Sequence, residues 1–342
     1  KSRRPMTMEI QNYADFASEL HRRVTERRIP ACGTIELTHR CPLNCVHCYN
    51  NLPPDDAEAR RREMGPEELF PLLEEVCRAG CLWLLLTGGE IFLRQDFWEV
   101  YLFAKKQGLI ITLFTNAALL DEADADRLAE RPPHAVEVTI YGRTRETHER
   151  ITRTPGSYER CLRGIRLLRE RGIPLKLKTM AMALNHSEIG ALQRWAEEDL
   201  GVRFLFDPIL NPRLDGSASP LAHRLTPAEV AALDARDSRR MAEWRAFADR
   251  FVGPLPAQCR QDAYQCGGGL SSFVIDPYGR MSLCLLSRRD VYDLRRGSFR
   301  EGWERFFPGV RGRKARRRTR CTDCTIKPLC GMCPANGEME NR

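Results

Sequence analysis

The sequence contains no long hydrophobic run. Its most apolar stretch, Leu82–Leu86, has the length of a strand and ends at Thr87-Gly88-Gly89. A membrane-spanning helix needs about 20 apolar residues, so the sequence predicts a soluble protein with no membrane partner. Residues 1–30 are rich in arginine but lack the apolar segment of a secretory signal. We therefore expect a cytoplasmic protein.

Low-complexity tracts and internal repeats are absent too, apart from one basic run over residues 311–320, RGRKARRRTR. With 42% hydrophobic and 29% charged residues, the composition is that of a globular protein, which excludes a disordered or fibrous chain. Its 342 residues predict about two domains. The net charge of +8 and the basic run could allow the protein to bind nucleic acid or an acidic peptide. Because such runs are usually solvated surface, a nucleic-acid partner is disfavoured.

The 14 cysteines are the compositional anomaly. Disulfides are rare in a reducing compartment, so a cysteine-rich cytoplasmic chain more often uses its thiols to bind metal. Four cysteines stand apart from any motif, within helix or strand patterns, and we expect them to be small buried side chains: Cys32, Cys77, Cys81 and Cys161.

Strand-like and helix-like segments alternate through the first 206 residues. Apolar, β-branched runs predict six strands, at Thr34–Leu37, Leu82–Leu86, Leu109–Phe114, Val136–Ile140, Leu175–Met180 and Val202–Phe206. Helical spacing predicts helices between them, at Glu67–Arg78, Phe97–Gln107, Glu122–Glu130, Tyr158–Arg171 and Ile189–Leu200. Six strand-then-helix units indicate an α/β protein with a parallel sheet. Periodicity alone leaves open whether the sheet is a partial barrel or open.

The first functional motif is a cysteine triplet, C-x3-C-x2-C, at Cys41, Cys45 and Cys48, directly after the first predicted strand. Three thiolates this close can bind three irons of one iron–sulfur cluster and leave the fourth iron open for chemistry. The alternatives are a zinc site completed by His39 or His47, and unligated structural cysteines.

The second motif is Gly88-Gly89-Glu90, where the second predicted strand ends. Glycines let a ligand approach the backbone closely, and a carboxylate can accept hydrogen bonds from an ammonium group. A Gly-Gly pair after a strand is equally often an ordinary turn.

Together, the triplet and the Gly-Gly-Glu segment resemble those of the radical S-adenosylmethionine (radical SAM) enzymes. The resemblance implies a partial (β/α)6 TIM-like barrel, with a catalytic [4Fe–4S] cluster on Cys41, Cys45 and Cys48. The open iron would chelate the methionyl group of S-adenosylmethionine (SAM), whose amine would contact Gly88, Gly89 and Glu90. One electron would then cleave SAM to a 5′-deoxyadenosyl radical that abstracts a substrate hydrogen.

Further positions follow from the same resemblance. Asn116 belongs to a segment similar to the family's third-strand Thr-Asn pair, and Thr139 and Arg153 are candidates to contact the ribose and carboxylate of SAM. Tyr141 stands where relatives often have an acid, so no role is transferred to it. His134, His148, His186 and His223 are expected at the surface or hydrogen-bonded.

The C-terminal cysteines resemble the SPASM extension of peptide-modifying radical SAM enzymes, which carries two auxiliary [4Fe–4S] clusters. The first auxiliary cluster would use Cys259, Cys266, Cys284 and Cys333, and the second Cys321, Cys324 and Cys330. Cys330 and Cys333 are spaced C-x2-C rather than C-x3-C, and the final cysteine is absent. The motifs supply ten cysteines where three clusters need eleven. We expect the eleventh ligand beyond Arg342; the alternatives are that Asp323 or Glu338 replaces it, or that the second auxiliary cluster is incomplete.

The expected organisation is an N-terminal extension (1–30), a radical SAM barrel (31–210), a linker with a helix that starts at Thr226-Pro227 (211–252) and a SPASM region (253–342). The leading hypothesis is modification of a peptide or protein, with a separate leader-binding partner protein and a one-electron donor. One alternative is a radical SAM enzyme that acts on a small molecule. The other is a zinc-ribbon protein that binds nucleic acid. The sequence does not choose among cross-linking, epimerisation, excision and oxidation.

Overall fold

The computed structural model describes residues 13–253, 262–314, 319–321, 324–330 and 333–340. One nine-stranded sheet organises the chain, in the order β6-β5-β4-β3-β2-β1-β7-β8-β9. The strands are β1 Cys32–Thr38, β2 Trp83–Gly88, β3 Ile110–Thr115, β4 Ala135–Thr139, β5 Leu175–Met180, β6 Arg203–Asp207, β7 Ser272–Ile275, β8 Arg280–Ser282 and β9 Tyr292–Asp293.

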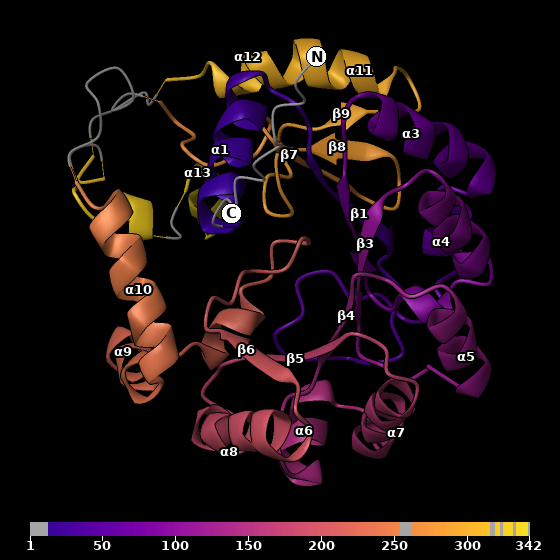
Figure 1. Ribbon diagram of the computed structural model, residues 1–342, viewed down its shortest axis with the longest axis vertical. Helices are drawn as coiled ribbons and strands as arrows, with labels where there is room; N and C mark the ends of the chain where they lie inside the picture. The colour runs from indigo at the N-terminus through magenta and orange to yellow at the C-terminus, as the bar shows by residue number, and fades with distance from the viewer. Residues whose placement is uncertain (1–12, 254–261, 315–318, 322–323, 331–332, 341–342) are drawn as a thin grey trace, which may run out of the picture.

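The first six strands are all parallel and each pairs with the next along the chain. Figure 1 shows them curved around an interior, with helices outside them. The expected partial (β/α)6 barrel is therefore confirmed, and the choice between barrel and open sheet is settled in favour of the barrel. Within the described residues, no helix is both long and apolar enough to cross a membrane.

The helices of the barrel are α1 Tyr13–Glu26, α2 Ala57–Arg62, α3 Pro66–Arg78, α4 Phe97–Lys106, α5 Glu122–Glu130, α6 Arg145–Thr152, α7 Ser157–Glu170 and α8 Ile189–Arg194. Those that follow are α9 Pro227–Arg236, α10 Ser238–Phe251, α11 Phe299–Glu301, α12 Phe307–Arg311 and α13 Pro334–Glu340. The expected helix start at Thr226 is confirmed, because its side chain and that of Glu229 form a capping box with Pro227 at the first position.

Alternation along the strands gives the sheet two different faces. Leu86, Leu113, Val138 and Leu177 are fully buried in the main hydrophobic core, among side chains of the outer helices. Burying each such side chain contributes about 1.5–3 kcal/mol. The intervening residues face the barrel interior and are largely polar, among them Glu36, Thr112, Glu137, Thr139, Lys176 and Lys178. The hydrophobic core thus lies between the sheet and the outer helices, and the interior face of the barrel carries the polar side chains.

The C-terminal region continues the barrel's sheet. β7 pairs in parallel with β1, from Cys32–Ser272 to Ile35–Ile275. β7 and β8 then form an antiparallel hairpin, with Ile275 opposite Met281. Main-chain hydrogen bonds between β1 and β7 therefore join this region to the barrel.

A buried ion pair reinforces this connection. Glu36 on β1 has no solvent exposure and accepts a hydrogen bond of 2.6 Å from Arg288. It also accepts hydrogen bonds from Tyr49, Asn50 and His39. Burial alone would raise the pKa of Glu36, but the bond with His39 and the charge of Arg288 lower it to about 2. Glu36 is therefore ionised and fully paired.

We expect Arg288→Met to lower the free energy of unfolding by about 3–5 kcal/mol, because it leaves the Glu36 carboxylate buried and unpaired. Anaerobic urea titration measures this loss. Arg289→Met is the matched control, since Arg289 is 70% exposed and its pair with Glu338 spans 3.4 Å, so its cost should stay below about 1 kcal/mol. Equal effects of the two substitutions would contradict the assignment.

Candidate active site

The three cysteines of the triplet lie on one loop between β1 and α2, at the carboxyl end of the sheet. Cys41 and Cys45 are buried, and Cys48 is partly buried. The loop is anchored to the end of α6, where Asn44 N donates to Thr152 O (3.0 Å) and Val46 N donates to Ile151 O (2.9 Å). Its position is therefore set by the barrel.

An apolar shell surrounds this loop, separate from the main core. It consists of Leu43, Ala118, Tyr141, Ile151, Met182 and Leu210. Burial raises the pKa of all three thiols, and the neighbouring thiols raise those of Cys41 and Cys45 further. Thiolates in such a shell need a bound cation to become favourable, and an iron–sulfur cluster supplies one. The donor set thus fits the expected cluster.

A single zinc ion fits the triplet less well. Among the residues that the structure describes, no three His, Cys, Asp or Glu side chains are grouped so as to hold one metal ion. His39 is engaged by Glu36 at 3.3 Å. In a cluster each thiol binds a different iron, so the thiols need not meet at one point.

Gly88 and Gly89 bring the end of β2 against the start of the cysteine loop. Gly89 N donates to Thr38 O (2.6 Å) and Glu90 N donates to Arg40 O (3.0 Å). A Cβ on Gly88 would overlap the carbonyl oxygen of Thr38, and one on Gly89 that of Arg40. Gly88 also has φ +134°, which favours glycine. The glycine pair is thus required by the loop that carries Cys41.

Glu90 and Asn116 link the sheet to Cys41. Glu90 is fully buried and accepts hydrogen bonds from Thr115 Oγ1 (2.7 Å), Phe92 N (3.2 Å) and Asn116 N (2.9 Å). Asn116 Nδ2 in turn lies 3.4 Å from Cys41 Sγ. Burial raises the pKa of Glu90 to about 7, against the effect of these hydrogen bonds. Both residues therefore hold the loop in place, whatever they contact in a ligand.

Thr139 and Arg153 lie at the ends of two different elements, β4 and α6. Thr139 ends β4 on the interior face, opposite Lys178 of β5. Arg153 caps α6 with a left-handed backbone (φ +50°) and is exposed, directly after the two carbonyls that hold the loop. The structure thus places Thr139 inside the barrel and Arg153 at the surface, beside the end of α6 that holds the cysteine loop.

Tyr141, His47 and His148 form an aromatic group beside Cys45. The Tyr141 hydroxyl interacts with the Cys45 thiol, and its ring lies 4.9 Å from that of His47 and 5.7 Å from that of His148. Within the described residues, His47 Nδ1 and His148 Nε2 are buried without a hydrogen-bond partner. Burial lowers the pKa of both histidines to about 4. Both are therefore neutral at pH 7.

His148 is hydrogen-bonded, as expected, because Tyr141 N donates to its Nδ1 at 3.3 Å. It is also buried, because the unpredicted helix α6 turns it inward. The expectation for Cys32 was wrong, since it is exposed on the first residue of β1. Cys81 and Cys161 are buried as expected, and Cys77 is partly buried.

Arg213 fixes the other end of the cysteine loop. Its guanidinium donates to Cys48 O (3.1 Å), Asn51 Oδ1 (2.6 Å) and Asn51 O (3.1 Å). Cys48 Sγ is 3.4 Å from Asn50 Oδ1, and Asn50 in turn donates to Glu36. Sequence analysis did not identify Arg213, Glu36 or Arg288, because no local pattern reports contacts across more than 160 residues.

The structure brings part of the C-terminal cysteine set together. Burial raises the pKa of Cys284, and the nearby thiols of Cys333 and Cys266 raise it further. Cys321 and Cys330 are exposed and Cys324 is partly buried. Cys259 and Asp323 lie outside the described residues. Arg311, from the basic run, donates to Cys266 O at 2.9 Å.

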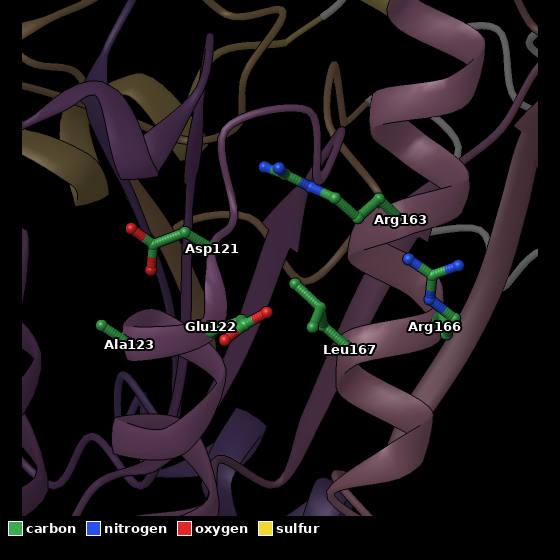
Figure 2. A pocket seen from close by; sticks show the side chains of 6 residues that line it. All are labelled: Asp121, Glu122, Ala123, Arg163, Arg166 and Leu167. Atoms are coloured by element: carbon green, nitrogen blue, oxygen red, sulfur yellow. The ribbon is translucent and has the colours of Figure 1, made fainter.

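A surface pocket of about 330 Å³ lies away from these residues, between the outer helices α5 and α7. Figure 2 shows Asp121 and Glu122 on its α5 side and Arg163 and Arg166 on its α7 side. Asp121 is used to cap α5, and Arg163 donates to Leu120 O at 3.4 Å. None of the expected site residues lines this pocket.

A three-cysteine loop at the carboxyl edge of a partial (β/α)6 barrel defines a class of enzyme. Residues 35–196 match the radical SAM superfamily, so this stretch of the chain is a radical SAM domain. That superfamily implies SAM and a [4Fe–4S] cluster as cofactors.

Three relatives refine this assignment. The AdoMet-dependent heme synthase of Methanosarcina barkeri is 26% identical over 88% of this chain and 90% of its own length. The PqqA peptide cyclase of Granulibacter bethesdensis is 33% identical, but over 43% of this chain and 39% of its own length. SuiB of Streptococcus suis, solved with its precursor peptide SuiA, has the same fold over 98% of this chain and 80% of its own, with 14% identity and a TM-score of 0.71.

We expect Gly89→Ala to lose most of the iron bound by the triplet and about 1–3 kcal/mol of stability, because the added methyl group meets the Arg40 carbonyl. Iron analysis and thermal unfolding of the anaerobic protein measure the two effects. Gly190→Ala on α8 is the control, since its nearest neighbour is 3.8 Å away. Full iron retention in Gly89→Ala would show that the loop tolerates displacement.

Proposed function

We propose that this enzyme modifies a peptide, in the manner of a maturase that acts on a ribosomally made precursor. The observation that carries the proposal is the fold shared with SuiB, a protein solved with a precursor peptide, over 98% of this chain. The PqqA peptide cyclase match supports it within the barrel. The partners in this scheme are the peptide, a one-electron donor and a separate leader-binding protein. The proposed location is the cytoplasm, where thiols stay reduced.

Cys41, Cys45 and Cys48 are the proposed ligands of the catalytic cluster. Bound together, the cluster and SAM supply one-electron cleavage of the sulfonium and hydrogen abstraction from the substrate. Gly88, Gly89 and Glu90 are proposed to contact the SAM amine, with Asn116 beside them. Thr139 and Arg153 are proposed to contact its ribose and carboxylate. The apolar shell around the loop excludes water from the reacting groups.

Two auxiliary clusters are proposed for the C-terminal region. Cys259, Cys266, Cys284 and Cys333 would hold the first, which is supported by the nearness of Cys266 and Cys333 to Cys284, whose pKa they help to raise. Cys321, Cys324 and Cys330 would hold three irons of the second. The division into residues 1–30, 31–210, 211–252 and 253–342 is likewise proposed, with the fourth part joined to the barrel through β7.

A second candidate function is modification of a tetrapyrrole. The observation that favours it is the match to the M. barkeri heme synthase, which extends over 88% of this chain and 90% of the relative. A peptide substrate and a tetrapyrrole substrate are separated by supplying each to the reduced enzyme and following the mass of the product.

Replacing Cys41, Cys45 and Cys48 together by Ala should abolish 5′-deoxyadenosine formation from SAM and dithionite. The anaerobically reconstituted wild type should bind about eleven to twelve irons and the variant about four fewer. Iron, sulfide and 5′-deoxyadenosine assays measure this. Retained cleavage of SAM in the variant would defeat the proposed mechanism, and zinc in place of iron would favour the zinc-ribbon alternative.

Cys284→Ala should remove about four irons from the C-terminal region while leaving the triplet's cluster in place. Cys161→Ala is its control, because Cys161 is buried against the carbonyl of Thr139, away from either cysteine group. Iron analysis and Mössbauer spectroscopy distinguish the two. Equal iron content in both variants would mean that Cys284 binds no cluster.

A further inference from the structure

Lys178 is a largely buried cation on the interior face of the sheet that the proposed mechanism leaves unused. It lies on β5 directly opposite Thr139 of β4, and its side chain is only 21% exposed. Its neighbour Leu177 points the other way, into the helix-covered core. Lys178 therefore faces the same space as Thr139, where SAM and substrate are proposed to meet.

Lys178 shares its carboxylate partner with a second lysine. Glu137 on β4 is shared by two lysines, with Lys176 Nζ at 3.3 Å and Lys178 Nζ at 3.6 Å. On the flanking strand β6, Arg203 pairs with Glu243 and Asp207 accepts a hydrogen bond from Ile209 N. One carboxylate thus balances two interior ammonium groups, and its bond to Lys178 is the longer.

The other neighbour of Lys178 is an aromatic ring. Its Nζ lies 2.6 Å from the ring centroid of Phe114 on β3. A ring stabilises a cation electrostatically but does not replace the oxygen acceptors that an ammonium group has in water. Burial lowers the pKa of Lys178 to about 7, although Glu137 opposes this. A second carboxylate would supply the missing acceptor and charge.

We propose that Lys178 binds a carboxylate group of the substrate on the interior face of the barrel. This rests on the proposed function, since it places the substrate beside Thr139. Two sources offer this chemistry: an aspartate or glutamate side chain of a peptide, and a propionate of a tetrapyrrole. A substrate carboxylate held here brings the adjoining carbon atoms into the space that the proposed SAM contacts border.

The test measures binding to the reconstituted, SAM-loaded enzyme at pH 6, where Lys178 is protonated. The probes are a synthetic glutamate-containing pentapeptide, its glutamine twin and coproporphyrin III. We expect Lys178→Met to weaken binding of an acidic probe at least tenfold and Lys178→Arg to keep it within about threefold. The glutamine peptide should bind weakly and equally to all variants. Wild-type affinity should fall above pH 7, as the lysine loses its proton.

Lys106→Met, on the exposed side of α4, removes the same charge far from the interior and should leave binding unchanged. Thermal unfolding establishes that Lys178→Met is folded, and calorimetry should give it wild-type affinity for SAM. The proposal is overturned if Lys178→Met binds both acidic probes as wild type does, if wild type does not prefer them to the glutamine peptide, or if SAM affinity falls instead. Binding of coproporphyrin III alone would support the carboxylate site and reject the peptide function.

Discussion

The site depends on the close approach of two backbones, Gly88-Gly89 at the end of β2 and Thr38–Arg40 at the end of β1. Parallel strands end at the same edge of a sheet. Here a side chain at position 88 or 89 would push the end of β2 away from the end of β1. Because the two glycines have no Cβ atoms, main-chain hydrogen bonds continue beyond the last paired residues of β1 and β2 and into the cysteine loop. The first thiol, Cys41, therefore starts from a rigid strand rather than from a free turn. Asn116, after β3, reaches it with its side chain, and Glu90, after β2, holds Asn116 in place.

Burial also determines the pKa values of the ionisable groups around the cysteine loop. Three thiols, a carboxylate and two histidines are buried within one apolar shell, and burial shifts the pKa of each acid upward and of each histidine downward. In such surroundings burial favours the neutral form of each group, and a bound cation favours the charged form of the thiols and the carboxylate. Arg213, Tyr141 and Asn116 are polar groups that touch the cysteines from outside the loop. The environment thus favours a positively charged inorganic group over empty thiols.

Much of this arrangement could be predicted from the sequence, for physical reasons. The six barrel strands alternate in burial or are continuously apolar, and the triplet is local, so periodicity and spacing find both. Helix α6 was missed because its sequence, RETHERIT, is polar apart from Ile151, and with it the inward position of His148 was missed. Arg288 and Arg213 reach the site from distant segments, and one sequence contains no signal for such pairs. Tyr141 was left without a role, and the structure gives it a thiol partner.

The parallel pairing of β7 with β1 also sets an order of events during synthesis. β1 is made near residue 32 and its partner near residue 272, so one edge of the growing barrel stays unpaired while some 240 residues are added. The cysteine loop is complete long before Arg288 can neutralise Glu36. During synthesis the edge of β1 is therefore unpaired. Glu36, which is buried in the folded protein, still lacks the positive charge of Arg288. Pairing of the β1 edge and neutralisation of Glu36 therefore await the synthesis of residues 272–288.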